Sequence, residues 1–346
     1  MDSPLLAVSG AVAAEFPDVG VAAHYGDPFA EQRALAEAAG LVDRSNRDVL
    51  RISGKDRLSW LNSISTQKVD DLAAGSAQQT LILSPHGHVE HHLSLVDDGS
   101  DTWIHVEPGE AESLLEFLES MRFMLRVEVA DVSGDHAVLT VLGPAAGDIA
   151  AGLDGVRASV NPGPFGTIDL IVARDRLAGA AGDLVRRGAA AAGMWAFEAL
   201  RIAAHVPRLG LDTDHRTIPH EVGWIDAAVH LDKGCYRGQE TVARVHNLGH
   251  PPRRLVFLSL DGSEDRLPGH GDPVELASDE QRATIGFTGS AARHYELGPI
   301  GLALVKRTVP VDATLLAGGV PASQEVIVPP DAGANVKVTL RRRQLM

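Results

Sequence analysis

The chain has 346 residues, more than one hydrophobic core usually serves, which predicts two or three domains. Hydrophobic residues make up 45% and charged residues 22%, a balance typical of a folded globular protein and not of a disordered one. The net charge of −15 excludes a broad nucleic-acid-binding surface, because phosphates are repelled on average. The single cysteine excludes an intrachain disulfide and fits a reducing compartment. No apolar stretch is long enough to cross a membrane, so we expect a cytoplasmic protein without a membrane partner.

The first half of the chain predicts a segment that packs on an α/β core, followed by a ferredoxin-like domain. Residues 1–48 are alanine-rich and weakly patterned, with one predicted helix at Pro28–Ala39. Residues 49–133 alternate between strand and helix patterns in the order of a split βαβ unit with an added strand. The predicted strands are Val49–Ile52, Gln79–Leu83, Val89–Val96, Thr102–Val106 and Arg126–Val132, and the helices are Lys55–Asn62 and Glu110–Met124.

Residues 134–250 predict a second α/β domain. Its expected strands are His136–Leu142 and Thr167–Ala173, and its expected helices are Ala145–Leu153, Leu177–Arg187 and Met194–His205. On the last helix, Glu198 and Arg201 can pair at the surface, which stabilises a helix by only about 0.2–0.5 kcal/mol. A ligand carboxylate is the functional alternative for Arg201.

Residues 251–346 change character, with short apolar runs between glycines and prolines. The predicted strands are Arg254–Leu260, Pro273–Leu276, Ala283–Phe287, Ile300–Val305, Glu325–Val328 and Val336–Leu340. Strands without helices are typical of a small antiparallel barrel. The predicted fold class is therefore α+β, with two ferredoxin-like α/β domains and a C-terminal antiparallel β-barrel.

The segment Lys233–Glu240 holds the only cysteine, Cys235, between two glycines that permit tight turns. The residues that follow, Glu240–Leu248, predict a short helix closed by a glycine. Cys235 would then lie just before a helix N-terminus and between Lys233 and Arg237, and both features stabilise a thiolate. We predict a reactive thiol with a lowered pKa. A small buried hydrophobe is the alternative for a lone cysteine, but charged and glycine-rich flanks do not suit a core strand.

Basic residues gather around this segment. Five positive charges against one negative charge, Glu240, give a balance of +4 between Lys233 and Arg254. This predicts an anionic small ligand or a local RNA contact, with a solvated helix face as the alternative.

The sequence Lys-Gly-Cys-Tyr-x-Gly-Gln-Glu at 233–240 resembles the signature of the YgfZ family, folate-binding relatives of the glycine-cleavage T-protein (GcvT, aminomethyltransferase). Arg201-Ile202, Pro207–Gly210 and Thr217–Glu221 resemble the segment that precedes it in that superfamily. The resemblance runs from about Val49 onward. It implies a T-protein-like three-domain arrangement around a central opening that holds tetrahydrofolate.

The resemblance also implies a function in the assembly or repair of iron–sulfur clusters, and so indirectly in tRNA modification. Its partners would be folate and iron–sulfur proteins or their assembly machinery, without stable nucleic acid. Cys235 would be the reactive group, Lys233 would hold it as a thiolate, and Gln239 and Glu240 would orient the loop. One thiolate cannot hold a cluster that normally takes four cysteines.

The folate contacts expected from this resemblance are Arg201, Glu221, Tyr236 and Trp224, the last as a stacking surface. A core aromatic is the alternative for Trp224.

Two departures from the T-protein pattern put aminomethyl transfer in doubt. T-proteins place a catalytic aspartate in the strand that here reads Val89–Leu93, which contains none. His91 or His92 would have to act as the base instead. T-proteins also carry a glutamate that contacts the pterin in the loop matching Gly163–Thr167, where the nearest acid is Asp169.

Four histidines crowd into seven residues, at 86, 88, 91 and 92, around Glu90. On a strand, His88, Glu90 and His92 would share one face, a possible metal site. No second cluster supplies a fourth ligand, so we predict no metal there.

Three functions remain open from the sequence. The first is a YgfZ-like tetrahydrofolate-binding protein with a reactive Cys235. The second is a folate-dependent aminomethyl or one-carbon transferase or demethylase. The third is a non-enzymatic interaction module in which the basic residues bind a partner.

Overall fold

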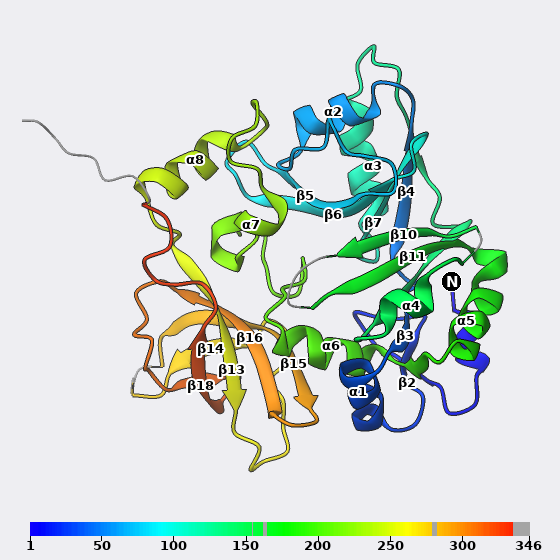
Figure 1. Ribbon diagram of the computed structural model, residues 1–346. Coiled ribbons are helices and arrows are strands. Elements are labelled where there is room, and N and C mark those ends of the chain that lie inside the picture. The colour runs from blue at the N-terminus through cyan, green and yellow to red at the C-terminus, as the bar shows by residue number, and fades with distance from the viewer. Residues whose placement is uncertain (154, 162–164, 279–281, 335–346) are drawn as a thin grey trace, which may run out of the picture.

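Two five-stranded sheets and a closed six-stranded barrel form the framework of the described residues (Figure 1). The structure is a computed structural model, and it describes residues 1–153, 155–161, 165–278 and 282–334. Among these residues, no helix is both long and apolar enough to span a membrane. The predicted combination of two α/β sheets and a C-terminal antiparallel barrel is confirmed.

The first sheet has the strand order β5-β6-β7-β4-β8, and all neighbours are antiparallel. The strands are β4 (Asp48–Ser53), β5 (Ala77–Leu83), β6 (Val89–Asp97), β7 (Asp101–Val106) and β8 (Glu128–Asp131). The helices α2 (Arg57–Ile64) and α3 (Ala111–Ser120) cover one face, where Leu114 and Leu118 are buried. The helix predicted to reach Met124 ends at Ser120, because Phe123 adopts a left-handed φ of 49° and turns into solvent.

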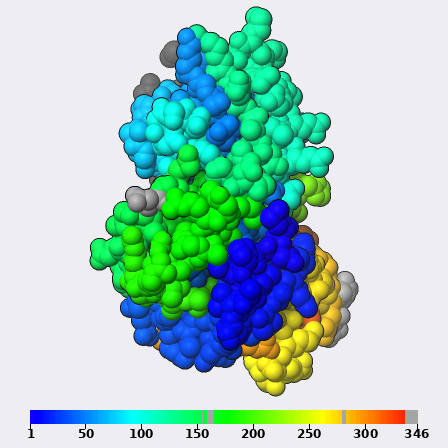
Figure 2. All heavy atoms as spheres, turned by 90° about the vertical axis from the view of Figure 1, so that its right-hand side faces the viewer, coloured from blue at the N-terminus to red at the C-terminus, as the bar shows by residue number. Residues whose placement is uncertain are grey.

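The second sheet has the order β10-β11-β9-β3-β12. Its strands are β3 (Gly40–Asp43), β9 (His136–Leu142), β10 (Arg157–Asn161), β11 (Thr167–Ala173) and β12 (Ala190–Ala192). The N-terminal segment therefore does more than pack on the core, since β3 pairs with β9 on one side and runs parallel to β12 on the other. Figure 2 shows this segment, in dark blue, against the green second domain and between the first domain and the barrel.

Helices and one small hairpin surround the second sheet. They are α1 (Pro28–Glu37), α4 (Ala146–Ala150), α5 (Leu177–Arg186), α6 (Met194–Ala203), the 3-10 helices η1 (Pro4–Ala7) and η2 (Arg174–Arg176), and the strands β1 (Val12–Ala13) and β2 (Ala22–His24). The two five-stranded sheets meet through buried apolar side chains, among them Val49 and Trp103 from the first and Val138 and Ile171 from the second.

The barrel closes in the order β13-β16-β15-β14-β17-β18. Its strands are β13 (Arg253–Leu260), β14 (Pro273–Leu276), β15 (Thr284–His294), β16 (Gly298–Lys306), β17 (Leu315–Ala317) and β18 (Val320–Val326). The strand predicted at Glu325–Val328 begins earlier, at Val320, where its pairing with β17 starts. The predicted strand Val336–Leu340 lies outside the described residues.

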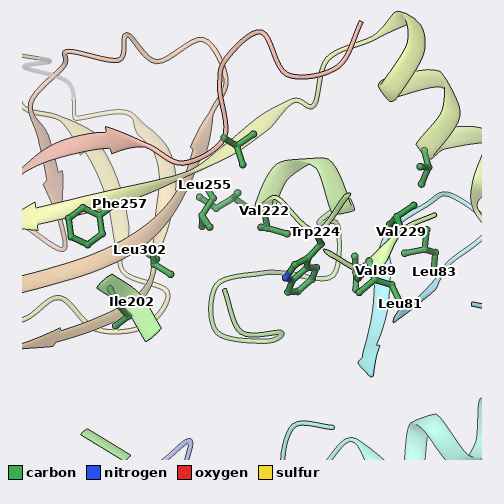
Figure 3. Close-up of a cluster of buried hydrophobic side chains, with 14 of the residues drawn as sticks. Leu81, Leu83, Val89, Ile202, Val222, Trp224, Val229, Leu255, Phe257 and Leu302 are labelled. Atoms are coloured by element: carbon green, nitrogen blue, oxygen red, sulfur yellow. The ribbon is translucent and has the colours of Figure 1, made fainter. Parts of the chain in front are cut away.

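The connection between the sheets and the barrel carries the 3-10 helix η3 (Pro219–Val222), α7 (Ile225–Ala228) and α8 (Gln239–Leu248). The helix predicted at Glu240–Leu248 is confirmed and is capped by Gly249. A buried apolar cluster joins this connection to both neighbours, with Leu81 and Val89 from the first sheet and Leu255 and Leu302 from the barrel (Figure 3). Trp224 lies between the two groups.

Candidate functional site

A cavity of about 810 Å³ opens where the two sheets, α6, the connecting segment and the barrel meet. The first sheet contributes Gln79, His92 and Ser94 to its wall, and the second sheet contributes Thr167 and Asp169. The size is that of a pocket for a drug-sized ligand. The central opening expected from the resemblance therefore has a counterpart in the structure.

Trp224 is both a core residue and a wall of this cavity. Its side chain is buried within the apolar cluster of Figure 3, and its ring centroid lies 4.6 Å from that of His92. The sequence left a core residue and a stacking surface as alternatives, and the structure combines them. Contact between Trp224 and a ligand remains a prediction.

His92 and His91 point to opposite faces of β6, because side chains alternate along a strand. His92 faces the cavity, where its Nε2 lies 3.2 Å from Oε1 of Gln79. Burial lowers the pKa of His92 to about 4, so its imidazole is neutral at pH 7. His91 is buried on the other face, with Nδ1 3.1 Å from a carboxylate oxygen of Glu110. Of the two predicted substitutes for the missing aspartate, only His92 reaches the cavity.

Asp169 is the acid nearest the loop that differs from the T-protein pattern. Its carboxylate lies in the cavity wall and contacts three side chains. Its carboxylate accepts a hydrogen bond from Thr140 Oγ1 at 2.6 Å, and Arg44 and His105 lie 3.3 and 3.2 Å away. Burial opposes ionisation, but His105, Arg44 and Thr140 outweigh it and hold the pKa of Asp169 well below its usual range. In the loop itself, Phe165 lines the cavity and its ring packs edge-on against Phe197.

Arg201, a predicted folate contact, is the hub of a buried hydrogen-bond network. Its guanidinium donates twice to Glu198, at 3.0 and 2.7 Å, and once each to Asp212 Oδ2, Ser290 Oγ and the carbonyl of Val206. These five bonds use all five N–H groups of an arginine. The pairing with Glu198 is present, but the expectation of a surface pair is wrong because Arg201 is only 2% exposed.

Arg208 joins Arg201 in a layer of buried charges that the sequence analysis missed. Its guanidinium contacts Asp18 at 3.1 Å, Glu107 at 2.7 Å and Glu198 at 3.0 Å. Burial opposes charge on Arg208, but these carboxylates raise its pKa well above the usual value. The only sequence signal was the resemblance of Pro207–Gly210, which identified no partner.

Glu221 and Tyr236, also predicted folate contacts, are buried outside the cavity wall. Glu221 accepts hydrogen bonds from Arg253 and from the backbone N–H of Ile218, which closes the turn of η3. Tyr236 belongs to the apolar cluster, and its hydroxyl has no hydrogen-bond partner among the described residues. Folate contacts at both positions stay predictions.

The loop with Cys235 is held in place by Lys233. The Nζ of Lys233 donates to the carbonyls of Asn62, Ser65 and Gln67 at 2.6, 2.8 and 2.7 Å. These carbonyls belong to the end of α2 and the residues after it, which ordinarily lack helix partners. The ammonium predicted to stabilise the thiolate thus uses its three donors on the backbone of the first domain.

Cys235 itself is free and exposed, and it does not line the cavity. Gln239 closes the loop by donating from Nε2 to the carbonyl of Lys233 at 3.4 Å, while Glu240 is exposed in the first turn of α8. The structure therefore brings Lys233, Cys235 and Gln239 into one braced loop.

Two glycines press this loop against the turn between β5 and β6. Gly238 has a φ of 82°, and a Cβ there would lie 2.6 Å from the carbonyl oxygen of Ser84. Gly87, in the turn, has a φ of 81°, and a Cβ there would lie 2.7 Å from Thr241 of α8. The loop with Cys235 and the hairpin that carries His92 are in direct backbone contact.

The histidine cluster of this hairpin is dispersed. Glu90 pairs with Arg237 at 2.9 Å, and His91 faces away from His92. Among the described residues, no group of three or more histidine, cysteine or acidic side chains is arranged to hold a metal ion.

The basic residues between 233 and 254 do not form one patch either. Arg253 pairs with Asp214 and Glu221, and Arg254 is buried in the barrel, where it donates to Val309 and Gln324. Arg244 is exposed on α8, and its side chain makes no hydrogen bond or ion pair in the described part of the chain, although its carbonyl accepts from the N–H of Gly249. An anionic or RNA partner at this surface stays a prediction.

Comparison with known proteins identifies the family of this chain. The GCVT N-terminal domain profile matches residues 6–180, about half of the chain, and the chain belongs to this family. It is similar to the aminomethyltransferase of Geobacillus kaustophilus, with 29% identity over 308 residues, 81% of this chain and 82% of the relative. The aminomethyltransferase of Symbiobacterium thermophilum is 26% identical over 290 residues, 74% of this chain and 76% of the relative.

Among solved structures, glycine cleavage system aminomethyltransferase T from Bartonella henselae has the same fold. The TM-score is 0.78 over 96% of this chain and 98% of that chain, at 17% sequence identity. The T-protein-like arrangement expected from the sequence is thereby confirmed as a fold.

Proposed function

We propose that the chain binds a reduced folate in the central cavity and uses the exposed Cys235 in the assembly or repair of iron–sulfur clusters. The observation that carries the folate part is the cavity of about 810 Å³, with the rings of Trp224 and His92 in its wall. Planar rings beside amide and hydroxyl groups suit a ligand that has an aromatic ring system with hydrogen-bonding edges. Gln79 and Ser94 supply those polar groups.

Two features support a function other than aminomethyl transfer. The strand facing the cavity carries the neutral His92 where, by resemblance, T-proteins carry an acid. Cys235 lies outside the cavity and is exposed, so its thiol is accessible to a partner from solvent rather than to a bound folate. The Lys233–Glu240 sequence, similar to the YgfZ signature, supports a cluster-related partner.

The test of the folate part is calorimetric titration with tetrahydrofolate. Wild type and Cys235→Ser should bind saturably with the same affinity, because the thiol is not in the cavity wall. Ser94→Phe should lose binding because it fills the cavity, whereas the matched Ser113→Phe, on the exposed side of α3, should not. If the folded wild type does not bind tetrahydrofolate, the proposal that the cavity is a folate site is wrong.

The test of the cluster part is an iron–sulfur enzyme activity in host cells that lack their own copy of the chain. Cys235→Ala should abolish the support that wild type gives, and Arg244→Glu should retain it. The reverse order would favour an interaction module instead.

A folate-dependent aminomethyl or one-carbon transferase or demethylase is the second candidate. It is favoured by the names of the relatives and by His92, a neutral imidazole that faces the cavity and can accept a proton. Turnover of an aminomethyl donor by wild type, lost in His92→Phe, would establish it in place of the first candidate.

A further inference from the structure

The central cavity has two chemically different ends. Gln79, His92 and Ser94 line the end at the first sheet. The end at the barrel is lined by His205, His220 and His246, with residues 327–329, 332 and 333 of the C-terminal segment beside them. Trp224 contacts His92 and also belongs to the apolar cluster that joins the first sheet to the barrel (Figure 3).

His220, the second residue of η3, is buried in this wall without a partner. Its side chain lines the cavity, the residue is 6% exposed, and neither Nδ1 nor Nε2 has a hydrogen-bond partner among the described residues. Burying a polar ring without satisfying it destabilises a fold, so such a group needs an explanation. A ligand in the cavity can supply the missing partner.

Within the described part of the chain, no acidic side chain acts on His220. Burial and, secondarily, the charge of His246 lower the pKa of His220 to about 4, and no carboxylate acts against them. The ring of His246 lies 6.1 Å away on α8. On β13, which also packs against η3, Arg253 is directed to Asp214 and Glu221 and Arg254 lies in the barrel. The other charged groups of α8, Glu240 and Arg244, are exposed, and Asp226 of α7 lines the cavity but does not shift the pKa of His220.

We infer that the barrel end of the cavity binds a carboxylate of the ligand, with His220 as its donor and His246 beside it. The inference rests on the proposed function, because a folate carries its glutamate carboxylates at the end opposite to its pterin. A hydroxyl or amide would satisfy one ring nitrogen, but only an anion favours a proton on both. The charged groups at the sheet end, Arg47 and Glu107, pair with each other, so this end, with Gln79 and the rings of His92 and Trp224, is left for the uncharged ring system.

Binding should therefore be linked to proton uptake. A carboxylate next to an imidazole raises the pKa of the imidazole, so the complex holds a proton that free His220 does not hold near neutral pH. Glutamate carboxylates stay ionised above pH 6, and affinity should rise as the pH falls from 8 to 6.5. An uncharged analogue should show no such rise.

The experiment is calorimetric titration of the full chain with tetrahydrofolate and with its diamide, in which both glutamate carboxylates are replaced by amides. Wild type should bind the acid about tenfold more tightly than the diamide at pH 6.5, and the preference should shrink at pH 8. His220→Gln, which keeps a polar side chain but cannot take a proton, should bind the two ligands within about twofold of each other. The matched variant His215→Gln, at an exposed position outside the cavity, should behave as wild type.

Equal affinity of wild type for the two ligands would overturn the inference and leave the proposed folate site standing. An undiminished preference in His220→Gln would overturn the assignment of the donor in the same way. If neither ligand binds, the proposed function falls and the inference falls with it.

Discussion

At the scale of single residues, the structure reassigns the charged groups around Cys235. Lys233 was predicted to hold a thiolate, yet its Nζ donates to three backbone carbonyls near the end of α2. The sequence places Lys233 two residues from the cysteine, but it does not reveal carbonyls that lie more than 160 residues earlier in the chain. The three hydrogen bonds of Lys233 thus attach the loop with Cys235 to the first domain.

Lys233→Met should lower the free energy of unfolding by about 2–4 kcal/mol, because three half-buried carbonyls lose their donor. Urea unfolding followed by circular dichroism measures the loss. Lys306→Met is the control, since the Nζ of Lys306 is exposed and donates to one carbonyl, and a change within about 0.5 kcal/mol is expected. Equal effects of the two variants would contradict this account of Lys233.

Arg201 shows the same limit of sequence reasoning. The helix pattern correctly pairs Arg201 with Glu198, three residues away. Asp212 and Ser290 lie 11 and 89 residues further along the chain, and only the folded arrangement brings them to the guanidinium. Spacing within one helix therefore indicated a weak surface pair where the structure has a buried hub.

At the scale of elements, long and strongly patterned segments were predictable and short ones were not. The strands β6, β9 and β11 lie close to their predicted bounds, because seven or more residues give a clear pattern. The strands β12 and β17 have three residues each, too few for any period, and β12 consists of alanines. Their pairing partners, not their own sequences, make them strands.

The contact between the start of α8 and the β5–β6 turn can be tested at Gly238. Gly238→Ala should lower the free energy of unfolding by about 1–3 kcal/mol, because the residue adopts a φ of 82° and the new Cβ would lie 2.6 Å from a carbonyl oxygen. In the same loop, Gly234→Ala should change it by less than about 0.5 kcal/mol, since a Cβ there meets nothing within 4 Å. Thermal unfolding of both variants makes the comparison, and a harmless Gly238→Ala would mean that the loop can move off the turn.

At the scale of the whole molecule, buried charges connect parts that are distant in sequence. Arg208 contacts Asp18 from the N-terminal segment, Glu107 at the end of β7 and Glu198 of α6. Through Glu198 the layer continues to Arg201 and from there to Ser290 of the barrel. The family resemblance predicted the three domains, but nothing in the local sequence indicated that ion pairs join them, because the partners lie up to 190 residues apart.

Arg208→Met should destabilise the fold by about 3–5 kcal/mol at pH 7.5, because it leaves buried carboxylates without their shared cation. Glu107 keeps Arg47 and Glu198 keeps Arg201, so Asp18 is the most affected. Burial already raises the pKa of Asp18 against the opposing effect of Arg208, and loss of the arginine raises it further. The folded variant then binds protons more tightly than its unfolded chain, so its stability relative to wild type should recover as the pH falls to 5.5.

Urea unfolding of wild type and Arg208→Met at pH 7.5 and 5.5 measures both effects. Arg216→Met is the matched control, because Arg216 is exposed and its side chain has no ion-pair partner among the described residues. It should change stability by less than about 0.5 kcal/mol at either pH. A penalty for Arg208→Met that is independent of pH would mean that lost packing, and not the uncompensated carboxylates, accounts for it. The buried charges would then be replaceable by apolar side chains without separating the N-terminal segment, the sheets and the barrel.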